Sequence, residues 1–428
     1  MSRIEIKRDI LLGTAGSATQ IDGGDFGHTW NLWYSAGKIK DGADPAVAAG
    51  HWERWRDDAM LMARMGIQTC RLGIEWARVE PSEGCFDEYA IDHIKEELML
   101  LNGLGIRPLI TLHHFTNPVW FEVCGGWDEP KTIVYFLRYV ERIITRLGHL
   151  CDDYVTINEP NVYALNGYRD GIWPPGKKNL RSAMRAMSVM ASAHIRAYRL
   201  IHRLRREMGL RGTRVGVALH MRSFAPKNRA NPAHCASAAM AERLFQTLIA
   251  EAVTVGRFAP PLHDYARARP GRYCDFHGLN YYTRSTVSGL RDGTKMYSQR
   301  SDLGWEIYPQ GLIQCAEKLM RICSLPIYVT ENGVCDNRDA FRCRFIYDHL
   351  MAISRSSLPF ERYYYWSFLD NFEWLEGTSA RFGLVEVDFS TMERRVKKSG
   401  RFYSELINRR EISPDMYEEF LSMESYHH

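Results

Sequence analysis

The sequence lacks the features that would place it in several common classes of protein. Its 428 residues hold no long apolar run, and no window approaches the roughly 18 apolar residues of a membrane-spanning helix. The start of the chain alternates charged and apolar side chains and does not read as a secretory signal. Its 55 Lys and Arg residues nearly balance its 51 Asp and Glu residues, leaving a net charge of +4. So small an excess gives no electrostatic reason to expect nucleic-acid or membrane partners.

Metal and cofactor motifs are also missing. The 10 cysteines are scattered, without the close pairs that bind zinc. Neither a GxxxxGK phosphate loop nor a GxSxG nucleophile elbow occurs. We therefore expect no metal and no cofactor. Because no export signal is evident, we also expect reduced thiols and a cytoplasmic location.

What the sequence does contain is a regular alternation of short β-rich runs and longer helical runs. Predicted strands lie at 11–20, 69–76, 106–114, 153–160, 214–221, 275–282, 326–332 and 362–371. Predicted helices lie at 51–65, 88–104, 130–149, 180–209, 236–255, 310–322, 339–354 and 396–408. Many of the strands are continuous apolar runs, which is typical of strands covered on both faces.

Eight strands that alternate with helices predict an α/β fold, a single (β/α)8 TIM barrel that spans residues 1–428 as one domain. An open doubly wound sheet is the alternative, and it usually carries a glycine-rich phosphate loop after its first strand. The segment GTAGSATQIDGGD after Leu12 does not fit that fingerprint. In a barrel, the active site lies at the C-terminal ends of the strands.

Two glutamates stand at such strand ends. Glu159 closes the run YVTINE, and Glu331 closes the run IYVTE. They follow the fourth and seventh predicted strands, so their side chains could face each other across the barrel mouth. A single glutamate at a strand end is more often solvated or salt-bridged, but a facing pair of carboxyls is what cleavage of a glycosidic bond requires.

The motifs around these residues resemble glycoside hydrolase family 1, the retaining β-glycosidases, over nearly the whole chain. They are ATQIDG (18–23), RLGIEWARVEP (71–81), TLHHFTNP (111–118), TINEP (156–160), GLNYYT (278–283), GWEIYPQG (304–311), YVTENG (328–333) and WSFLDNFEWLEG (366–377). The resemblance implies a retaining exo-β-glycosidase, β-glucosidase-like, that acts on a small-molecule β-glycoside or short oligosaccharide. The reaction would be a double displacement through a covalent glycosyl-enzyme.

The resemblance also implies the catalytic roles. Glu331 corresponds to the nucleophile and Glu159 to the acid/base, with Arg71 and Tyr282 beside the nucleophile. Both neighbours should favour ionised Glu331. Its negative charge should in turn raise the pKa of Glu159, so that Glu159 carries the proton in the first step.

The remaining site residues follow from the same resemblance. The candidate sugar-binding residues are Gln20, His114, Asn158, Asn280, Tyr282, Trp366, Glu373, Trp374 and Phe382, and Trp305 is expected on the leaving-group side. Three positions depart from the family pattern: Asp22 where Glu is usual, Phe115 where Trp is frequent, and Asn161 where many members carry an aglycone-flanking Trp. Trp173 is a candidate replacement for that last ring.

Two residues narrow the branch within the family. The 6-phospho-glycosidase branch carries Ser and Lys groups where this chain has Glu373, whose carboxylate would repel a phosphate, so we expect unphosphorylated substrates. Glu159 separates the chain from the thioglucosidase branch, in which Gln replaces the acid/base. β-Galactosidase or β-fucosidase specificity and a transglycosidase activity stay open, as does a homo-oligomer. An inactive sugar-binding protein is disfavoured because both glutamates are present.

Overall fold

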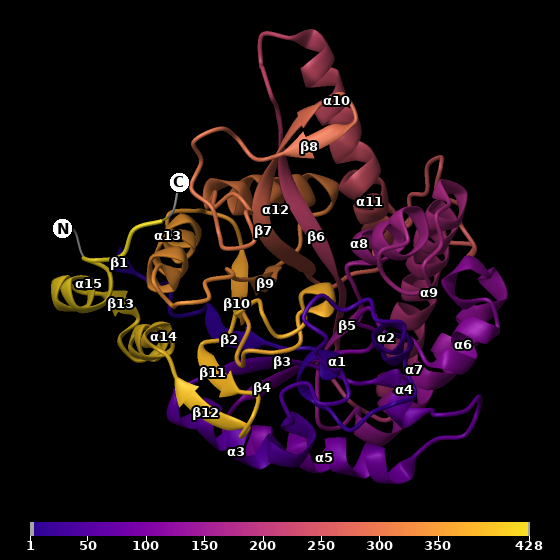
Figure 1. Ribbon diagram of the computed structural model, residues 1–428. Helices are drawn as coiled ribbons and strands as arrows, with labels where there is room; N and C mark the ends of the chain where they lie inside the picture. Colours follow the sequence, from indigo (N-terminus) through magenta and orange to yellow (C-terminus); the bar gives the residue numbers. More distant parts are fainter. Residues whose placement is uncertain (1–3, 427–428) are drawn as a thin grey trace.

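The computed structural model describes residues 4–426, and its centre is a closed barrel of parallel strands (Figure 1). The barrel strands are β2 (Leu11–Ala15), β3 (Thr69–Gly73), β4 (Arg107–Thr111), β5 (Asp153–Asn158), β6 (Arg214–Pro226), β7 (His277–Ser288), β9 (Ile327–Asn332) and β10 (Phe360–Trp366). They are hydrogen-bonded in the order β6-β5-β4-β3-β2-β10-β9-β7, and an additional pairing of β6 with β7 closes the ring. The predicted (β/α)8 barrel is confirmed, and the open sheet was the wrong alternative.

Helices cover the outside of the barrel. The main ones are α3 (His51–Arg64), α5 (Glu88–Gly103), α7 (Ile133–Leu147), α9 (Leu180–Glu207), α11 (Leu248–Val255), α12 (Gln310–Ile322), α13 (Arg342–Ser354) and α14 (Lys398–Arg409). In α7 the buried residues include Phe136, Tyr139, Val140, Ile143 and Ile144, spaced by one, three or four positions along one face. This apolar stripe is the face of the helix that is buried in the layer between the helices and the strands.

Shorter elements fill the connections. They are α1 (Ala18–Ile21), α2 (Thr29–Ser35), α4 (Trp76–Val79), α6 (Val119–Val123), α8 (Pro160–Ala164), α10 (Pro232–Glu242), α15 (Pro414–Phe420), η1 (Gly126–Asp128), η2 (Pro130–Thr132), η3 (Leu165–Asp170), η4 (Arg243–Thr247) and η5 (Trp374–Glu376). The predicted helix 236–255 is in fact α10, η4 and α11 in succession, beginning at Pro232 in the first helical position, where its missing N–H costs nothing.

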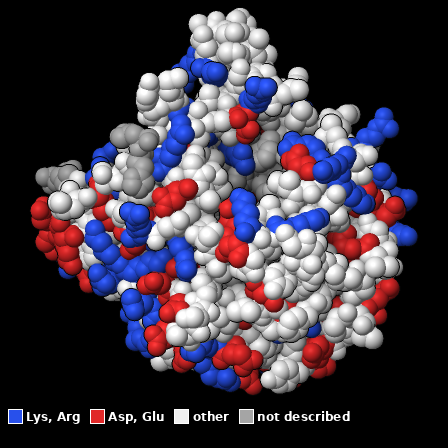
Figure 2. All heavy atoms as spheres, viewed as in Figure 1, with Lys and Arg blue, Asp and Glu red and all other residues white. Residues whose placement is uncertain are grey.

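Strands β6 and β7 run well beyond the barrel rim, further than the sequence predicted. Ser223 to Pro226 pair in parallel with Arg284 to Val287, and β8 (Arg291–Gly293) adds an antiparallel strand to β7. With α10 these strands form a projecting arm, at the top of Figure 1. The side chains here are more exposed, so the apolar pattern weakens, but pairing between the two strands satisfies the backbone. On the face shown in Figure 2, the surface is hollowed at the base of this arm.

The first and last strands of the described chain are paired. β1 (Ile4–Glu5) pairs antiparallel with β13 (Glu411–Ile412), and β11 (Val385–Asp388) forms a hairpin with β12 (Glu393–Val396). No helix within residues 4–426 combines the length and the apolarity needed to cross a bilayer. Basic and acidic side chains are interspersed over the face shown in Figure 2.

Candidate active site

The backbone at the end of β5 is irregular, and this irregularity delivers Glu159. Val155 pairs with Gly216 and Asn158 pairs with Ala218, so β5 uses one residue more than β6 over this step. Glu159 then takes a positive φ of 42°, which is uncommon for a residue with a side chain. Its N–H donates to the carbonyl of Ala218 at 2.7 Å, which holds the turn. Bulges and strained residues of this kind are often found where a strand has to aim a functional side chain.

Strand β9 has a matching irregularity before Glu331. Tyr328 pairs with Gly278 and Glu331 pairs with Asn280, so β9 carries one extra residue relative to β7. Gly333 follows at a point where a Cβ atom would lie 1.9 Å from the carbonyl oxygen of Trp366, so only glycine fits. The turn after Glu331 therefore packs directly on the strand end that carries Trp366.

Glu331 lies in a buried cationic and hydrogen-bonded setting. One carboxylate oxygen forms an ion pair with the fully buried guanidinium of Arg71. The other accepts a hydrogen bond from the Tyr282 hydroxyl at 2.6 Å. Both contacts are those expected from the sequence, and both stabilise the ionised carboxylate that a nucleophile requires.

Glu159 lies in a different setting on the same rim. Its Oε1 accepts a hydrogen bond from Asn280 Nδ2 at 2.8 Å and lies 3.1 Å from His220 Nδ1. Asn280 Nδ2 also reaches Asn158 Oδ1 at 3.0 Å, and Arg71 donates to that same oxygen at 2.7 Å. One network of side chains therefore connects the two carboxyls.

The pKa shifts of the two glutamates are the reverse of those expected from the sequence. Burial raises the pKa of Glu331 to about 7, with Glu159 adding to the rise and Arg71 and Tyr282 opposing it. Burial also raises the pKa of Glu159, but this is outweighed by the charge and hydrogen bond of His220, then by Asn280 and Arg71, so that this pKa is lowered. The sequence predicted the reverse because His220 was not among its candidates. The lowering depends first on a positive charge at His220.

The predicted sugar-binding residues gather around these glutamates. Gln20 Nε2 donates to Glu373 Oε2 at 3.1 Å and to the carbonyl of Phe372 at 2.9 Å. Asn158 Nδ2 lies 3.1 Å from His114 Nε2, and the His114 ring is stacked against that of Trp366 at 5.8 Å. The other histidine of the HH pair is structural, since His113 Nε2 lies 2.9 Å from Asn117 Oδ1 beneath the rim.

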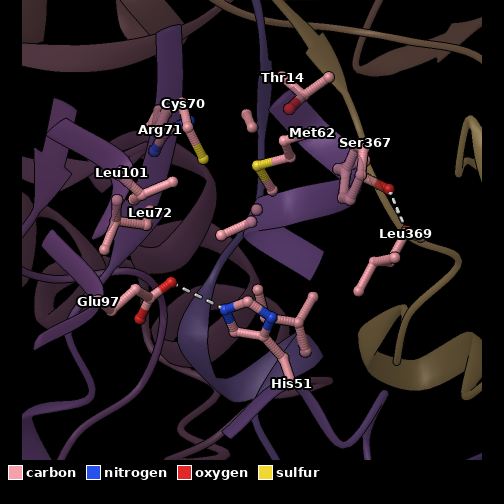
Figure 3. A pocket seen from close by; sticks show the side chains of 15 residues that line it. Thr14, His51, Met62, Cys70, Arg71, Leu72, Glu97, Leu101, Ser367 and Leu369 are labelled. Atoms are coloured by element: carbon pink, nitrogen blue, oxygen red, sulfur yellow. Dashed lines mark hydrogen bonds and ion pairs between the residues drawn. The ribbon is translucent and has the colours of Figure 1, made fainter. Parts of the chain in front are cut away.

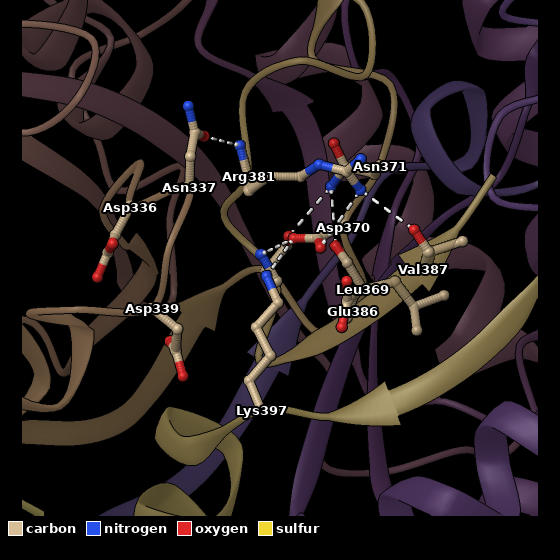
Figure 4. A network of polar contacts seen from close by, with 12 residues as sticks. Asp336, Asn337, Asp339, Leu369, Asp370, Asn371, Arg381, Glu386, Val387 and Lys397 are labelled. Atoms are coloured by element: carbon tan, nitrogen blue, oxygen red, sulfur yellow. Dashed lines mark hydrogen bonds and ion pairs between the residues drawn. The ribbon is translucent and has the colours of Figure 1, made fainter.

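The loop that carries Glu373, Trp374 and Phe382 is anchored from below by a polar network (Figure 4). Buried Asp370 accepts hydrogen bonds from Lys397 Nζ at 2.8 Å and from the N–H of Gly383 at 2.9 Å. Arg381 Nη1 lies 3.5 Å from the other Asp370 oxygen. A buried carboxylate with several donors is a rigid anchor, so it holds the loop that carries Glu373 and Trp374 in place.

The leaving-group side differs from the family pattern. The side chain of Asn161 is fully buried and donates to the carbonyl of His220 at 2.9 Å, so it ties the barrel rim together. Trp305 is half-buried, with its ring 5.6 Å from that of Tyr282 and 6.1 Å from that of Phe382.

Trp173 does not supply the ring that is missing at Asn161. It packs in an aromatic cluster, with ring centroids 4.8 Å from Phe115, 5.6 Å from Trp30 and 5.9 Å from Trp374. Its contacts are with the wall behind Trp374, and the suggested replacement is not supported.

A separate cavity lies behind the site, among β2, β3, α3 and α5 (Figure 3). Its lining includes Met62, Cys70, Leu72 and Leu101, and His51 at its edge lies 3.0 Å from Glu97. The lining includes neither Glu159 nor Glu331.

A further small cavity adjoins Asp22, the position where the family usually has a longer glutamate. Its lining includes Asp22, His51, Glu75 and Glu97. Burial raises the pKa of Asp22 to about 7 and that of Glu75 to about 8. A small space therefore adjoins the side chain of Asp22.

The sequence patterns did not single out two polar residues that lie beside Glu159 or contact its neighbour. His220 and Arg222 lie on β6, and Arg222 Nε donates to His220 Nε2 at 3.0 Å. His220 could have been found because it directly follows the apolar run VGVAL. A polar residue at the end of an apolar run is the pattern that identified the candidate residues on the other strands. Within residues 4–426, no group of three or more His, Cys, Asp or Glu side chains is arranged to hold a metal ion.

A closed (β/α)8 barrel with two buried glutamates at its strand ends, set among amide, imidazole and indole groups, is the arrangement of a glycoside hydrolase. The pattern of glycosyl hydrolase family 1 matches residues 2–412. The chain belongs to this family and is a retaining β-glycosidase.

Individual relatives agree with this placement. Beta-glucosidase A of Acetivibrio thermocellus is 30% identical, over 95% of this chain and 99% of that protein. The β-glycosidase from Pyrococcus horikoshii superposes with a TM-score of 0.90 at 32% identity, covering 98% of each chain. The β-glucosidase from Thermotoga maritima in complex with glucoimidazole gives a TM-score of 0.87 at 25% identity, over 96% of this chain and 100% of that one. Sequence and structure therefore agree on family and fold.

The electrostatics of Glu373 generate a stability prediction. Burial, followed by the charge of Glu331, raises the pKa of Glu373 to about 8. Because the fold favours the protonated form, wild-type stability is lost as pH rises from the usual carboxyl range toward 8. We expect Glu373→Gln, which is neutral at all pH values, to melt about 2 °C higher than wild type at pH 8. The difference should shrink as the pH is lowered to 5.

Thermal unfolding at a series of pH values measures this effect. Glu386→Gln, at an exposed position on β11, controls for the loss of one negative charge. A difference between Glu373→Gln and wild type that stays constant with pH would contradict the prediction.

Proposed function

We propose that the chain is an exo-acting β-glucosidase that hydrolyses unphosphorylated β-glycosides through a covalent glycosyl-enzyme on Glu331. The observation that carries this proposal is the contrast between two buried carboxyls on one rim. Glu331 is held by Arg71 and the Tyr282 hydroxyl, whereas Glu159 is held by Asn280 and His220. Two different environments suit two different roles.

In the first step, Glu331 attacks the anomeric carbon while Glu159 gives its proton to the departing oxygen. Retention requires the two carboxyl groups to be only about 5–5.5 Å apart, which leaves no space for a water between them. The shared contacts through Arg71, Asn158 and Asn280 support such closeness.

In the second step, Glu159 accepts a proton from water, and the water releases the sugar. Formation of the glycosyl ester removes the negative charge of Glu331. A nearby negative charge raises the pKa of an acid, so its removal lowers the pKa of neighbouring carboxyls. Glu159 therefore ionises more readily once the intermediate has formed. Arg71, released from its ion pair, remains hydrogen-bonded to Asn158 and Thr111.

The glycone is proposed to lie between the two glutamates and the loop after β10. Arg71 and Asn280 hold Asn158 in place, so that its side chain can bind the 2-hydroxyl of the sugar. Hydrogen bonds to this hydroxyl strengthen in the transition state and contribute roughly several kcal/mol. Gln20 and Glu373 form a hydrogen-bonded pair that can bind hydroxyls at the far end of the ring. Trp366 offers an apolar face to the C–H groups of the sugar.

The broader assignments rest on the same site. Its residues run from Gln20 to Phe382, which supports a single catalytic domain over residues 1–428. All 10 cysteines are free thiols, and six of them are buried, which suits the proposed reducing cytosol. β-Galactoside or β-fucoside hydrolysis and transfer to an alcohol acceptor use the same intermediate and are tested together with the main proposal.

A panel of aryl β-glycosides tests the substrate class. We expect the glucoside to give the highest kcat/KM and glucose 6-phosphate derivatives to be nearly inactive, because buried Glu373 stands where a phosphate would need a cationic partner. NMR of the first-formed sugar should show the β anomer, and added alcohol measures transfer. Preferred cleavage of the 6-phosphate derivative would overturn the assignment of unphosphorylated substrates.

Glu331→Ala should abolish turnover of every glycoside on the panel. Without the carboxylate no glycosyl ester can form, so the loss should exceed that for any substrate-binding residue. Steady-state hydrolysis measures it, with Glu386→Ala on the surface as the matched control. Wild-type rates in Glu331→Ala would remove the nucleophile assignment.

Glu159→Gln should harm substrates with poor leaving groups most. General acid catalysis contributes about 10²–10⁴-fold, and an activated phenol hardly needs it. The measurement is kcat/KM, which reports only the steps up to the glycosyl-enzyme. Equal losses for alkyl and dinitrophenyl glycosides would count against Glu159 as the acid.

A further inference from the structure

His220 and Arg222 form a polar pair directly behind Glu159, and the roles described so far do not use it. His220 Nδ1 lies 3.1 Å from Glu159 Oε1, and Arg222 Nε donates to His220 Nε2 at 3.0 Å. The His220 side chain is only 9% exposed, so its ring is nearly enclosed. The two residues are two positions apart on β6, which places them on one face of the strand.

The arginine decides the tautomer of the histidine. An arginine Nε always carries hydrogen and cannot accept a hydrogen bond, so Nε2 of His220 must present its lone pair. A neutral ring with Nε2 as acceptor carries its hydrogen on Nδ1, which faces Glu159. A protonated ring would set two N–H groups against each other at the Arg222 contact. The geometry therefore favours a neutral Nδ1–H histidine that donates to Glu159.

The surroundings hold both side chains in this arrangement. The His220 ring is stacked against the Tyr282 ring, with an angle of 17° between the two ring planes. The rings of His220 and Phe245 meet in an edge-on arrangement, with 5.8 Å between their centroids. The Arg222 guanidinium lies over the Phe245 ring at 5.1 Å and 3.4 Å from Asp292 Oδ2 on β8. Neither side chain can turn away without losing these contacts.

We propose that His220, locked by Arg222 as its neutral Nδ1–H tautomer, is a positioning residue that fixes which oxygen of Glu159 handles the catalytic proton. Oε1 accepts from both Asn280 and His220, so it has no free lone pair that suits a proton. Within residues 4–426, no hydrogen bond reaches Oε2. Oε2 is then the atom that protonates the leaving oxygen and later deprotonates water. The inference rests on the proposed role of Glu159 as the acid/base.

The pair also sets the ionisation of Glu159, in competition with the other groups that face it. These are Arg71 on β3, Tyr282 on β7, Glu331 on β9 and, further away, Glu373. Beyond His220 lie Arg222, Asp292 and Arg169. A neutral His220 contributes a hydrogen bond to the ionised carboxylate but no positive charge. Without that charge, the largest effect that lowers the pKa of Glu159 is absent, so the protonation that its acid role requires is less costly.

Two substitutions separate the hydrogen bond from the tautomer lock. His220→Phe keeps a ring between Tyr282 and Phe245 but removes the donor, so ionised Glu159 loses support. The basic limb of the kcat/KM profile should move up by about one pH unit, as loss of one charge-assisted hydrogen bond implies.

Arg222→Met removes the donor to Nε2, so that His220 can take up a proton and add positive charge beside Glu159. The basic limb should then move down by a similar amount.

The sign for Arg222→Met makes the test strict. Simple loss of a nearby cation would move the limb up, because ionised Glu159 would be less stabilised. The double variant should behave like His220→Phe alone, since Arg222 acts through the histidine. Arg169→Gln, which removes a neighbouring charge without touching His220, serves as the matched control. An upward shift in Arg222→Met, or additive shifts in the double variant, would overturn the proposal.

A spectroscopic measurement keeps the outcome independent of activity. In ¹⁵N-labelled protein at pH 7, the His220 side chain, assigned by its absence in His220→Phe, should show the neutral Nδ1–H pattern. In Arg222→Met it should titrate or change tautomer, and a wild-type Nε2–H pattern would refute the lock. If Glu159→Gln shows no dependence on leaving group while this pattern is present, the acid/base role fails and the tautomer lock stands.

Discussion

The buried charge of Arg71 is the constraint on which the rest of the site depends. Its guanidinium is fully enclosed, and a buried cation is tolerated only when it is paired and its hydrogen bonds are satisfied. Its partners are Glu331, the Thr330 carbonyl, Thr111 Oγ1 and Asn158 Oδ1, on strands β9, β4 and β5. One buried charge thus holds the side chains of Glu331 and Asn158 at once.

The same arrangement leaves the cleft rich in carboxyls that the fold does not neutralise fully. Burial raises the pKa values of Glu331 and Glu373 to about 7 and 8. Such groups oppose folding at neutral pH, yet a pre-formed ring of acceptors is what a polyhydroxylated substrate needs. The rigid Asp370 anchor below the loop holds Glu373 in place despite this cost.

Sequence patterns captured the parts of the structure that obey local rules. Buried strands are continuous apolar runs and outer helices are amphipathic, so all eight units and both glutamates could be located. The extra residues in β5 and β9 were not predictable, because a bulge depends on register with neighbouring strands. The long ends of β6 and β7 were missed because their pairing partners are each other, beyond the buried barrel. His220 and Arg222 matched no motif. Their contacts with Glu159 and with each other can be seen only when β6 is placed beside β5.

This last pair connects the periphery of the molecule to the reacting centre. A continuous line of contacts runs from Asp292 on β8 to Arg222, then to His220, and then to Glu159. Asp292 belongs to the projecting arm, which is built from the extensions of β6 and β7. On the face in Figure 2, the surface is hollowed at the base of this arm. Strand β6 therefore connects the arm to Glu159, because it builds part of the arm and also carries His220 and Arg222.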